Sequence, residues 1–114
     1  AIKLAGNMLM LANTAALAEV LQTLGQSGID PERALEALAA GPGSSRAVTH
    51  KGPVMVRGDF GPPARFTLAL AAKDARLAEE MIGGPVSRLV AETYERALHA
   101  GLGELDYSAV AELR

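Results

Sequence analysis

The chain has 114 residues, of which 49% are hydrophobic and only 4% are aromatic, and it contains no cysteine. Its 11 basic and 13 acidic residues give a formal net charge of −2, which argues against a general affinity for nucleic-acid backbones or anionic membranes. Without cysteine it has neither disulfides nor thiolate metal sites. We therefore expect one cytoplasmic domain whose core of alanine, leucine and valine is made by closely packed helices.

The first predicted element is a long helix from Ile2 to about Leu24 that is apolar on nearly every side. A helix of this kind belongs in the middle of a larger structure, and we therefore expect the chain to form a homodimer. Four polar or charged residues interrupt the helix and make it a poor membrane span: Lys3, Asn7, Asn13 and Glu19. Because the helix begins at residue 1 without a cap, we also expect more chain upstream.

The remaining elements are also predicted to be helices, each bounded by a capping side chain, a glycine or a proline. They are expected from Pro31 to about Ala40, from the Ser44–Ser45 pair through Val48 with Gly52–Pro53 closing it, over Ala64–Ile82, from Pro85 to Gly101, and over Tyr107–Leu113. Arg57–Pro63 is expected to be a loop. No alternating run is long enough to predict a strand, so the pattern indicates an all-α, multi-helix bundle.

Lys3 and Asn7 stand four residues apart on the first helix and therefore project from the same face. A lysine removed from water has a lowered pKa and can transfer protons near neutral pH, and a neighbouring asparagine donates and accepts hydrogen bonds without adding charge. In the alternative interpretation, Lys3 extends into water and Asn7 is a tolerated polar residue. The spacing alone leaves both interpretations open.

Lys73 lies in an apolar stripe on the helix predicted for Ala64–Ile82, in line with Phe66, Leu70 and Leu77. A charge in such a stripe needs a partner or a function. Asp74 lies about a quarter-turn away, where it could meet another helix. The alternative is a structural ion pair, or a solvated lysine at the edge of the stripe.

The sequence does not predict a metal site or an independent dinucleotide site. His50 and His99 have no carboxylate or cysteine at ligand spacing. The Gly41–Ser45 segment resembles a phosphate loop only superficially, because no strand precedes it and no Gly-Lys-Ser/Thr sequence ends it. The three spaced glycines of a dinucleotide fingerprint are also missing.

Four segments in order resemble the C-terminal domain of the β-hydroxyacid dehydrogenase family, which includes 3-hydroxyisobutyrate dehydrogenase. They are KLAGN, GIDPER, RGDF followed by PARFTLALAAKDARLA, and PVSRLVAETYERALHAGLGELDYSAVAEL. The resemblance spans essentially the whole chain and implies the helical fold found in 6-phosphogluconate dehydrogenase-like enzymes. One position departs from the pattern, because Gly6 stands where members often carry an asparagine.

The resemblance implies that residues 1–114 form the substrate and dimerisation domain of a two-domain oxidoreductase. A Rossmann domain, absent from this chain, would bind most of the NAD or NADP. By the resemblance, Lys3 is the catalytic lysine and Asn7 binds a small hydroxyacid or semialdehyde. Phe66, Lys73 and Asp74 would lie beside the cofactor. The competing hypothesis is a non-catalytic helical dimerisation or scaffold module.

Overall fold

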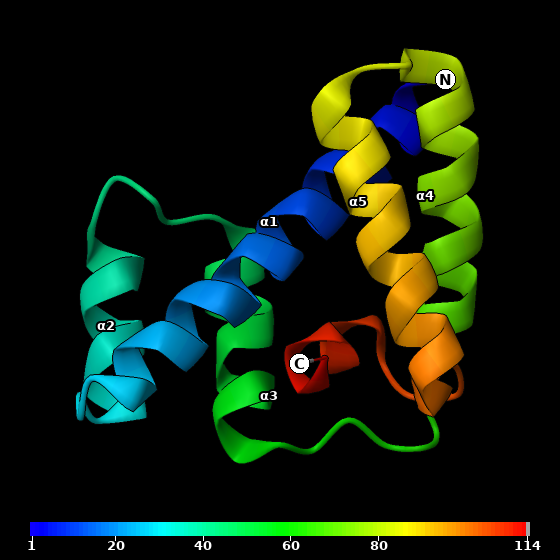
Figure 1. Cartoon of the computed structure of the whole chain (residues 1–114). Helices are drawn as coiled ribbons and strands as arrows, with labels where there is room; N and C mark the ends of the chain where they lie inside the picture. The colour runs from blue at the N-terminus through cyan, green and yellow to red at the C-terminus, as the bar shows by residue number, and fades with distance from the viewer. Residues whose placement is uncertain (114) are drawn as a thin grey trace.

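The computed structural model describes residues 1–113, in which turns and loops join helices and no strand is present. The predicted all-α class is therefore confirmed. The helical elements of these residues are α1 (Ile2–Gln26), α2 (Pro31–Ala40), η1 (Ala47–Lys51), α3 (Gly52–Arg57), α4 (Leu68–Ile82), α5 (Pro85–Ala97), η2 (Leu98–Leu102) and η3 (Tyr107–Glu112). Figure 1 shows α4 and α5 side by side, with α1 crossing them and continuing towards α2.

The central helix of the fold is α1, which contacts α2, α4, α5 and η3. Its buried residues Leu11, Thr14 and Leu17 lie in its middle turns, and Leu11 belongs to the main hydrophobic core. By length and composition alone α1 is also apolar enough to cross a membrane, so its four polar interruptions do not make it the poor span that the sequence analysis expected. In this fold its middle is a core element.

The region from α2 to α3 agrees with the sequence at its start and differs at its end. Asp30 accepts a hydrogen bond from the backbone of Arg33 at 3.2 Å, and this cap begins α2 at Pro31 as predicted. Gly52 and Pro53 were expected to close a short helix, but they occupy the first turn of α3 instead. This is possible because proline fits the first helical turn, where its missing N–H has no partner to lose.

Gly52 is buried against Leu35 of α2, so closely that an added Cβ would collide with the leucine side chain. The glycine therefore serves the contact between α2 and α3 and does not terminate a helix. The short apolar run that follows it, from Val54 to Val56, lies within α3.

The helix predicted to begin at Ala64 begins at Leu68. Thr67 has an extended backbone and its side chain caps α4 by accepting from the Leu70 N–H at 3.2 Å. The preceding residues pair with the C-terminal segment, because the Tyr107 N–H donates to the Phe66 carbonyl at 3.0 Å. Backbone groups committed to that pairing are not available to a helix.

The ends of α4 and α5 follow the predicted glycines. Gly83 ends α4 with a φ of +69°, and α5 begins at Pro85. The helical path after α5 continues through η2 and breaks at Gly101, where φ is +88°. Both positions use the left-handed conformation that glycine adopts without a Cβ penalty.

Candidate active site

Two residues far apart in the sequence meet where α1 crosses α4. The Nδ2 atom of Asn7 on α1 donates a hydrogen bond to Oδ2 of Asp74 on α4 at 3.0 Å, across a separation of 67 residues. Both side chains are half-buried. The predicted position of Asp74, turned towards another helix, is therefore confirmed, and its partner is the asparagine of the first motif.

Lys3 lies one helical turn before Asn7 on α1, and its side chain is exposed. The removal from water that the sequence suggested for Lys3 is therefore not found within residues 1–113. The first turn of α1 buries neither Ile2 nor Lys3. Ile2 beside it is 90% exposed.

The apolar stripe expected around Lys73 does not face the core. Lys73 is exposed, and so are Leu70, Leu77 and Met81 along the same side of α4. The helix instead buries its opposite side, which consists of one leucine and four alanines: Leu68, Ala71, Ala72, Ala75 and Ala78. Small side chains let α4 approach α5 and α1 closely, which explains why the alanine side was selected over the leucine side.

Asp74 forms no ion pair with Lys73 or with any other cation in residues 1–113. The structural ion pair considered from the sequence is therefore absent from the described part of the chain. Asp74 is held by the amide of Asn7, and Lys73 next to it remains open to solvent.

Phe66 lies just before α4, about two helical turns from Asp74. It is half-buried, and its ring packs at a tilt on Tyr107 with the ring centroids 5.1 Å apart. It therefore borders the N-terminal end of α4, where its ring contacts Tyr107.

The sequence did not predict the cluster that contains Phe66. The ammonium of Lys51 lies 4.7 Å from the centroid of the Tyr107 ring and 3.1 Å from Oδ2 of Asp106. The Asp106 carboxylate also caps η3 by accepting from the Ser108 N–H at 3.0 Å. The capping role of Asp106 was visible in the sequence, but nothing in the sequence related Lys51 to it across 55 residues.

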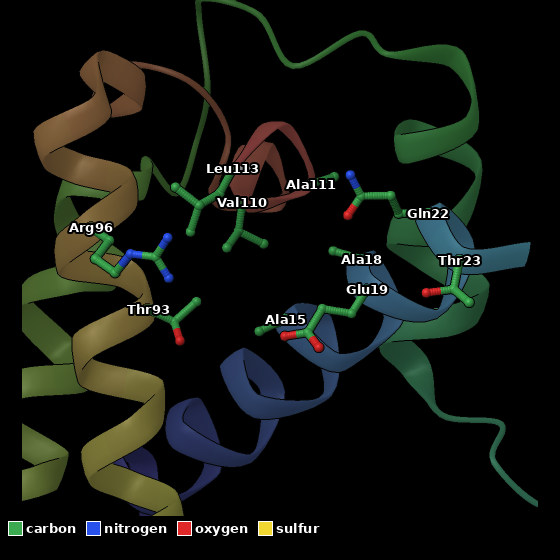
Figure 2. A pocket seen from close by; sticks show the side chains of 10 residues that line it. All are labelled: Ala15, Ala18, Glu19, Gln22, Thr23, Thr93, Arg96, Val110, Ala111 and Leu113. Carbon is green, nitrogen blue, oxygen red and sulfur yellow. The ribbon is translucent and has the colours of Figure 1, made fainter. Parts of the chain in front are cut away.

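A large concave surface lies away from these residues, between the second half of α1, α5 and η3. The groove has a volume of about 410 Å³, and Figure 2 shows Glu19 on one side of it and Arg96 on the other. Both side chains are exposed and no salt bridge joins them within residues 1–113. None of the site residues predicted from the sequence lines the groove.

The groups around Asn7 and Asp74 can hold only part of a dinucleotide. Oδ1 of Asn7 and Oδ1 of Asp74 make no hydrogen bond within residues 1–113, and Lys73, which precedes Asp74 on α4, is exposed. The acceptor oxygen of Asn7 and the amine of Lys73 are of the kinds that bind carboxamide and hydroxyl groups at one end of a dinucleotide. A pyrophosphate site of the strand–glycine turn–helix type is missing from residues 1–113, which include no strand. No three His, Asp or Glu side chains in these residues gather as a metal site.

Comparison with known proteins agrees with this fold and with the order of its motifs. The family described as "NAD-binding of NADP-dependent 3-hydroxyisobutyrate dehydrogenase" matches residues 1–114. Glyoxylate/succinic semialdehyde reductase 1 of Arabidopsis thaliana is 35% identical over 116 residues, which cover 97% of this chain and 39% of that protein. The 2-hydroxy-3-oxopropionate reductase of Escherichia coli is 30% identical, with 96% of this chain and 39% of that protein covered.

Among solved structures, 3-hydroxyisobutyrate dehydrogenase from Salmonella typhimurium superimposes with a TM-score of 0.91 at 23% identity. The match covers 99% of this chain and 41% of that protein, and at this identity it shows the fold alone. The chain thus spans about two fifths of the length of the relatives that it matches. It belongs to the family of C-terminal helical domains of 3-hydroxyisobutyrate dehydrogenase-like enzymes.

Proposed function

We propose that this chain is the substrate-side domain of an NAD(P)-dependent dehydrogenase that interconverts a small hydroxyacid and the corresponding oxo acid. The observation that supports this proposal most directly is the Asn7–Asp74 hydrogen bond. It joins two of the motifs on which the family resemblance rests, one helical turn from Lys3. The similar reductases are named for glyoxylate, succinic semialdehyde and 2-hydroxy-3-oxopropionate, which are all small carboxylic acids with an aldehyde group.

In the proposed reaction the nicotinamide supplies or accepts the hydride at the substrate carbon. Lys3 exchanges the proton at the substrate oxygen, accepting it when the alcohol is oxidised and donating it when the aldehyde is reduced. Asn7 binds the substrate beside that amine. Lys73, on the exposed side of α4, and Phe66, at the N-terminal end of that helix, would border the cofactor.

Since Lys3 is exposed in this chain, the reaction needs a second surface that covers it and excludes water. We propose that a dinucleotide-binding domain provides this cover and binds most of the cofactor. The 114-residue chain without such a domain is then expected to bind NAD(P) weakly and to show no turnover.

The test is a chimera in which this chain replaces the matched segment of the Arabidopsis reductase. We expect it to oxidise NADPH or NADH in the presence of glyoxylate, succinic semialdehyde or another short oxo acid. Lys3→Met should lower kcat by about a hundredfold or more, because general acid–base catalysis contributes roughly 10²–10⁴. Arg33→Met, the same loss of charge at an exposed position of α2, is the matched control.

Equal kcat for the Lys3→Met and Arg33→Met chimeras would contradict the proposed role of Lys3. A folded chimera that binds the dinucleotide but reduces no short oxo acid would favour the competing scaffold module.

We also propose that the chain associates as a homodimer through its helices. Within an apolar 18-residue window of α1, only 17% of the residues are buried within the chain. Ile2 and Leu9 of that helix are 90% and 61% exposed. Large apolar side chains left exposed on one helix in this way are typical of a protein–protein interface.

A further inference from the structure

The bond between Asn7 and Asp74 has a direction that chemistry fixes. A carboxylate only accepts hydrogen bonds, whereas an asparagine amide donates at Nδ2 and accepts at Oδ1. With Asp74 ionised, the amide has one favourable orientation, in which Nδ2 faces α4. If the amide were flipped, Oδ1 of Asn7 would face the carboxylate oxygen of Asp74. Both atoms are acceptors, so no hydrogen bond could form between them.

From this geometry we propose that Asp74 is a positioning residue that acts through Asn7, an inference that rests on the proposed function. By holding one N–H of Asn7, Asp74 turns the amide oxygen away from α4. The same face of α1 carries Lys3 one turn earlier. Asn7 therefore presents a fixed acceptor to a ligand bound beside that lysine, and the substrate hydroxyl, which donates a hydrogen bond, matches it.

The rest of the site supports this role over a direct contact between Asp74 and the cofactor. Asp74 is half-buried and engaged with α1, whereas Lys73 beside it on α4 is exposed. Lys73 is thus the residue of the pair that is open to a large ligand. The bond also crosses between helices, so it fixes the amide relative to α4 as well as to its own backbone.

The sharpest test exchanges the two residues. In Asn7→Asp/Asp74→Asn, the amide on α4 can donate to a carboxylate on α1, so the bond and the net charge are retained while their direction is reversed. We would compare this double variant with Asp74→Asn and Asn7→Asp in the chimera that carries the full chain. Measurements are kcat, the KM for the oxo acid, the KM for the dinucleotide, and the urea midpoint of the 114-residue chain.

We expect Asp74→Asn to lower kcat about tenfold to a hundredfold, the loss typical of a misplaced reacting geometry. The KM for the dinucleotide should change by less than about twofold. Loss of a direct hydrogen bond between Asp74 and the dinucleotide would instead raise this KM by up to about tenfold. The double variant should recover the urea midpoint lost in Asn7→Asp, in which two carboxylates face each other, but should not recover kcat.

Two results would overturn the inference. If the double variant recovers kcat together with the urea midpoint, the bond only holds α1 to α4. If Asp74→Asn raises the KM for the dinucleotide and leaves kcat unchanged, Asp74 contacts the cofactor directly.

Two further measurements separate the inference from the proposed function. Lys3→Met is measured in parallel, and a large loss of kcat there with none in Asp74→Asn would keep the function and reject the inference. In the 114-residue chain, the side-chain amide resonances of Asn7 should shift in Asp74→Asn. Resonances that do not respond to this substitution would reject the fixed amide even if no chimera were active.

Discussion

Tyr94 shows how one buried hydroxyl connects two helices. Its side chain is fully buried on α5, and its hydroxyl lies 3.4 Å from the carbonyl oxygen of Leu11 on α1, to which it donates. Burial raises the pKa of the Tyr94 hydroxyl above its ordinary value of 10.0, and the negative charges of ionised Tyr107 and Asp106 act in the same direction. The phenol therefore stays protonated and can continue to donate.

This raised pKa predicts a loss of stability in alkali. The unfolded chain releases the tyrosine proton above about pH 10, whereas the folded chain retains it, so the stabilisation is complete below that pH and decreases as the pH rises further. We expect the urea midpoint of the chain to fall as the pH rises above about 10. In Tyr94→Phe the fall should be smaller, because the titrating hydroxyl is removed while the ring remains buried.

Tyr94→Phe also removes a long hydrogen bond, which contributes about 0.5–1.5 kcal/mol at neutral pH. The comparison therefore uses the slope with pH and not the absolute midpoint. Equal slopes in the two proteins would show that Tyr94 does not contribute to the alkaline transition. Tyr107, whose pKa burial and Asp106 also raise, adds to the slope in both proteins.

At the scale of residues, the sequence predicted the local relations and missed the distant ones. Lys3 and Asn7 lie on one face of α1 because helical spacing alone determines that. The bond from Asn7 to Asp74 depends on where α1 crosses α4, and single-sequence periodicity contains no crossing angle. The exposure of Lys3 was unpredictable for the same reason, because it depends on what covers the first turn.

Among the elements, α4 best shows how packing selects between two possible faces. Both its leucine side and its alanine side have helical spacing, and the sequence analysis emphasised the leucines. The structure buries the alanines, since they allow the close contact with α5 and α1. A periodic pattern identifies a helix, but the distance to its neighbours decides which side of the helix is buried.

A larger side chain on the alanine side of α4 is therefore expected to destabilise the fold. Ala75 is 0% exposed and belongs to the main core. Ala75→Leu should lower the free energy of unfolding by about 1–3 kcal/mol, the usual range for an overpacked core. Ala69→Leu is the same substitution at an exposed position of the same helix, and we expect a change within about 0.5 kcal/mol.

Urea denaturation of the two variants and the parent measures both values. An Ala75→Leu variant as stable as the parent would mean that α4 and α5 can separate without loss, contrary to the close packing described.

The helix boundaries were predictable where a single residue sets them. Asp30, Gly83 and Asp106 each act locally, and each begins or ends a helix as expected. The start of α4 was displaced from Ala64 to Leu68 because residues before it pair with the C-terminal segment. That pairing joins residues about 40 positions apart, which no local pattern could reveal.

For the whole molecule, the exposed apolar side chains predict self-association. We expect the 114-residue chain to sediment as a dimer at micromolar concentration. Leu9→Glu should weaken the dimer by at least about tenfold, because it places a charge on the apolar surface of α1. Gln26→Glu adds the same charge at the exposed end of that helix and should leave the dimer intact. A parent chain that remains monomeric would contradict the proposed association.

The exposed start of α1 has a consequence for how the proposed site would be completed. Ala1 provides no side-chain cap, and Asn7 provides the first side-chain hydrogen bond from α1 to another helix within residues 1–113. Ile2 and Lys3 are exposed, so in the 114-residue chain the amide hydrogens of this turn should exchange faster than those of the buried middle of α1. Ordering this turn then accompanies binding of a covering surface, and part of the binding free energy offsets the entropy lost by the lysine.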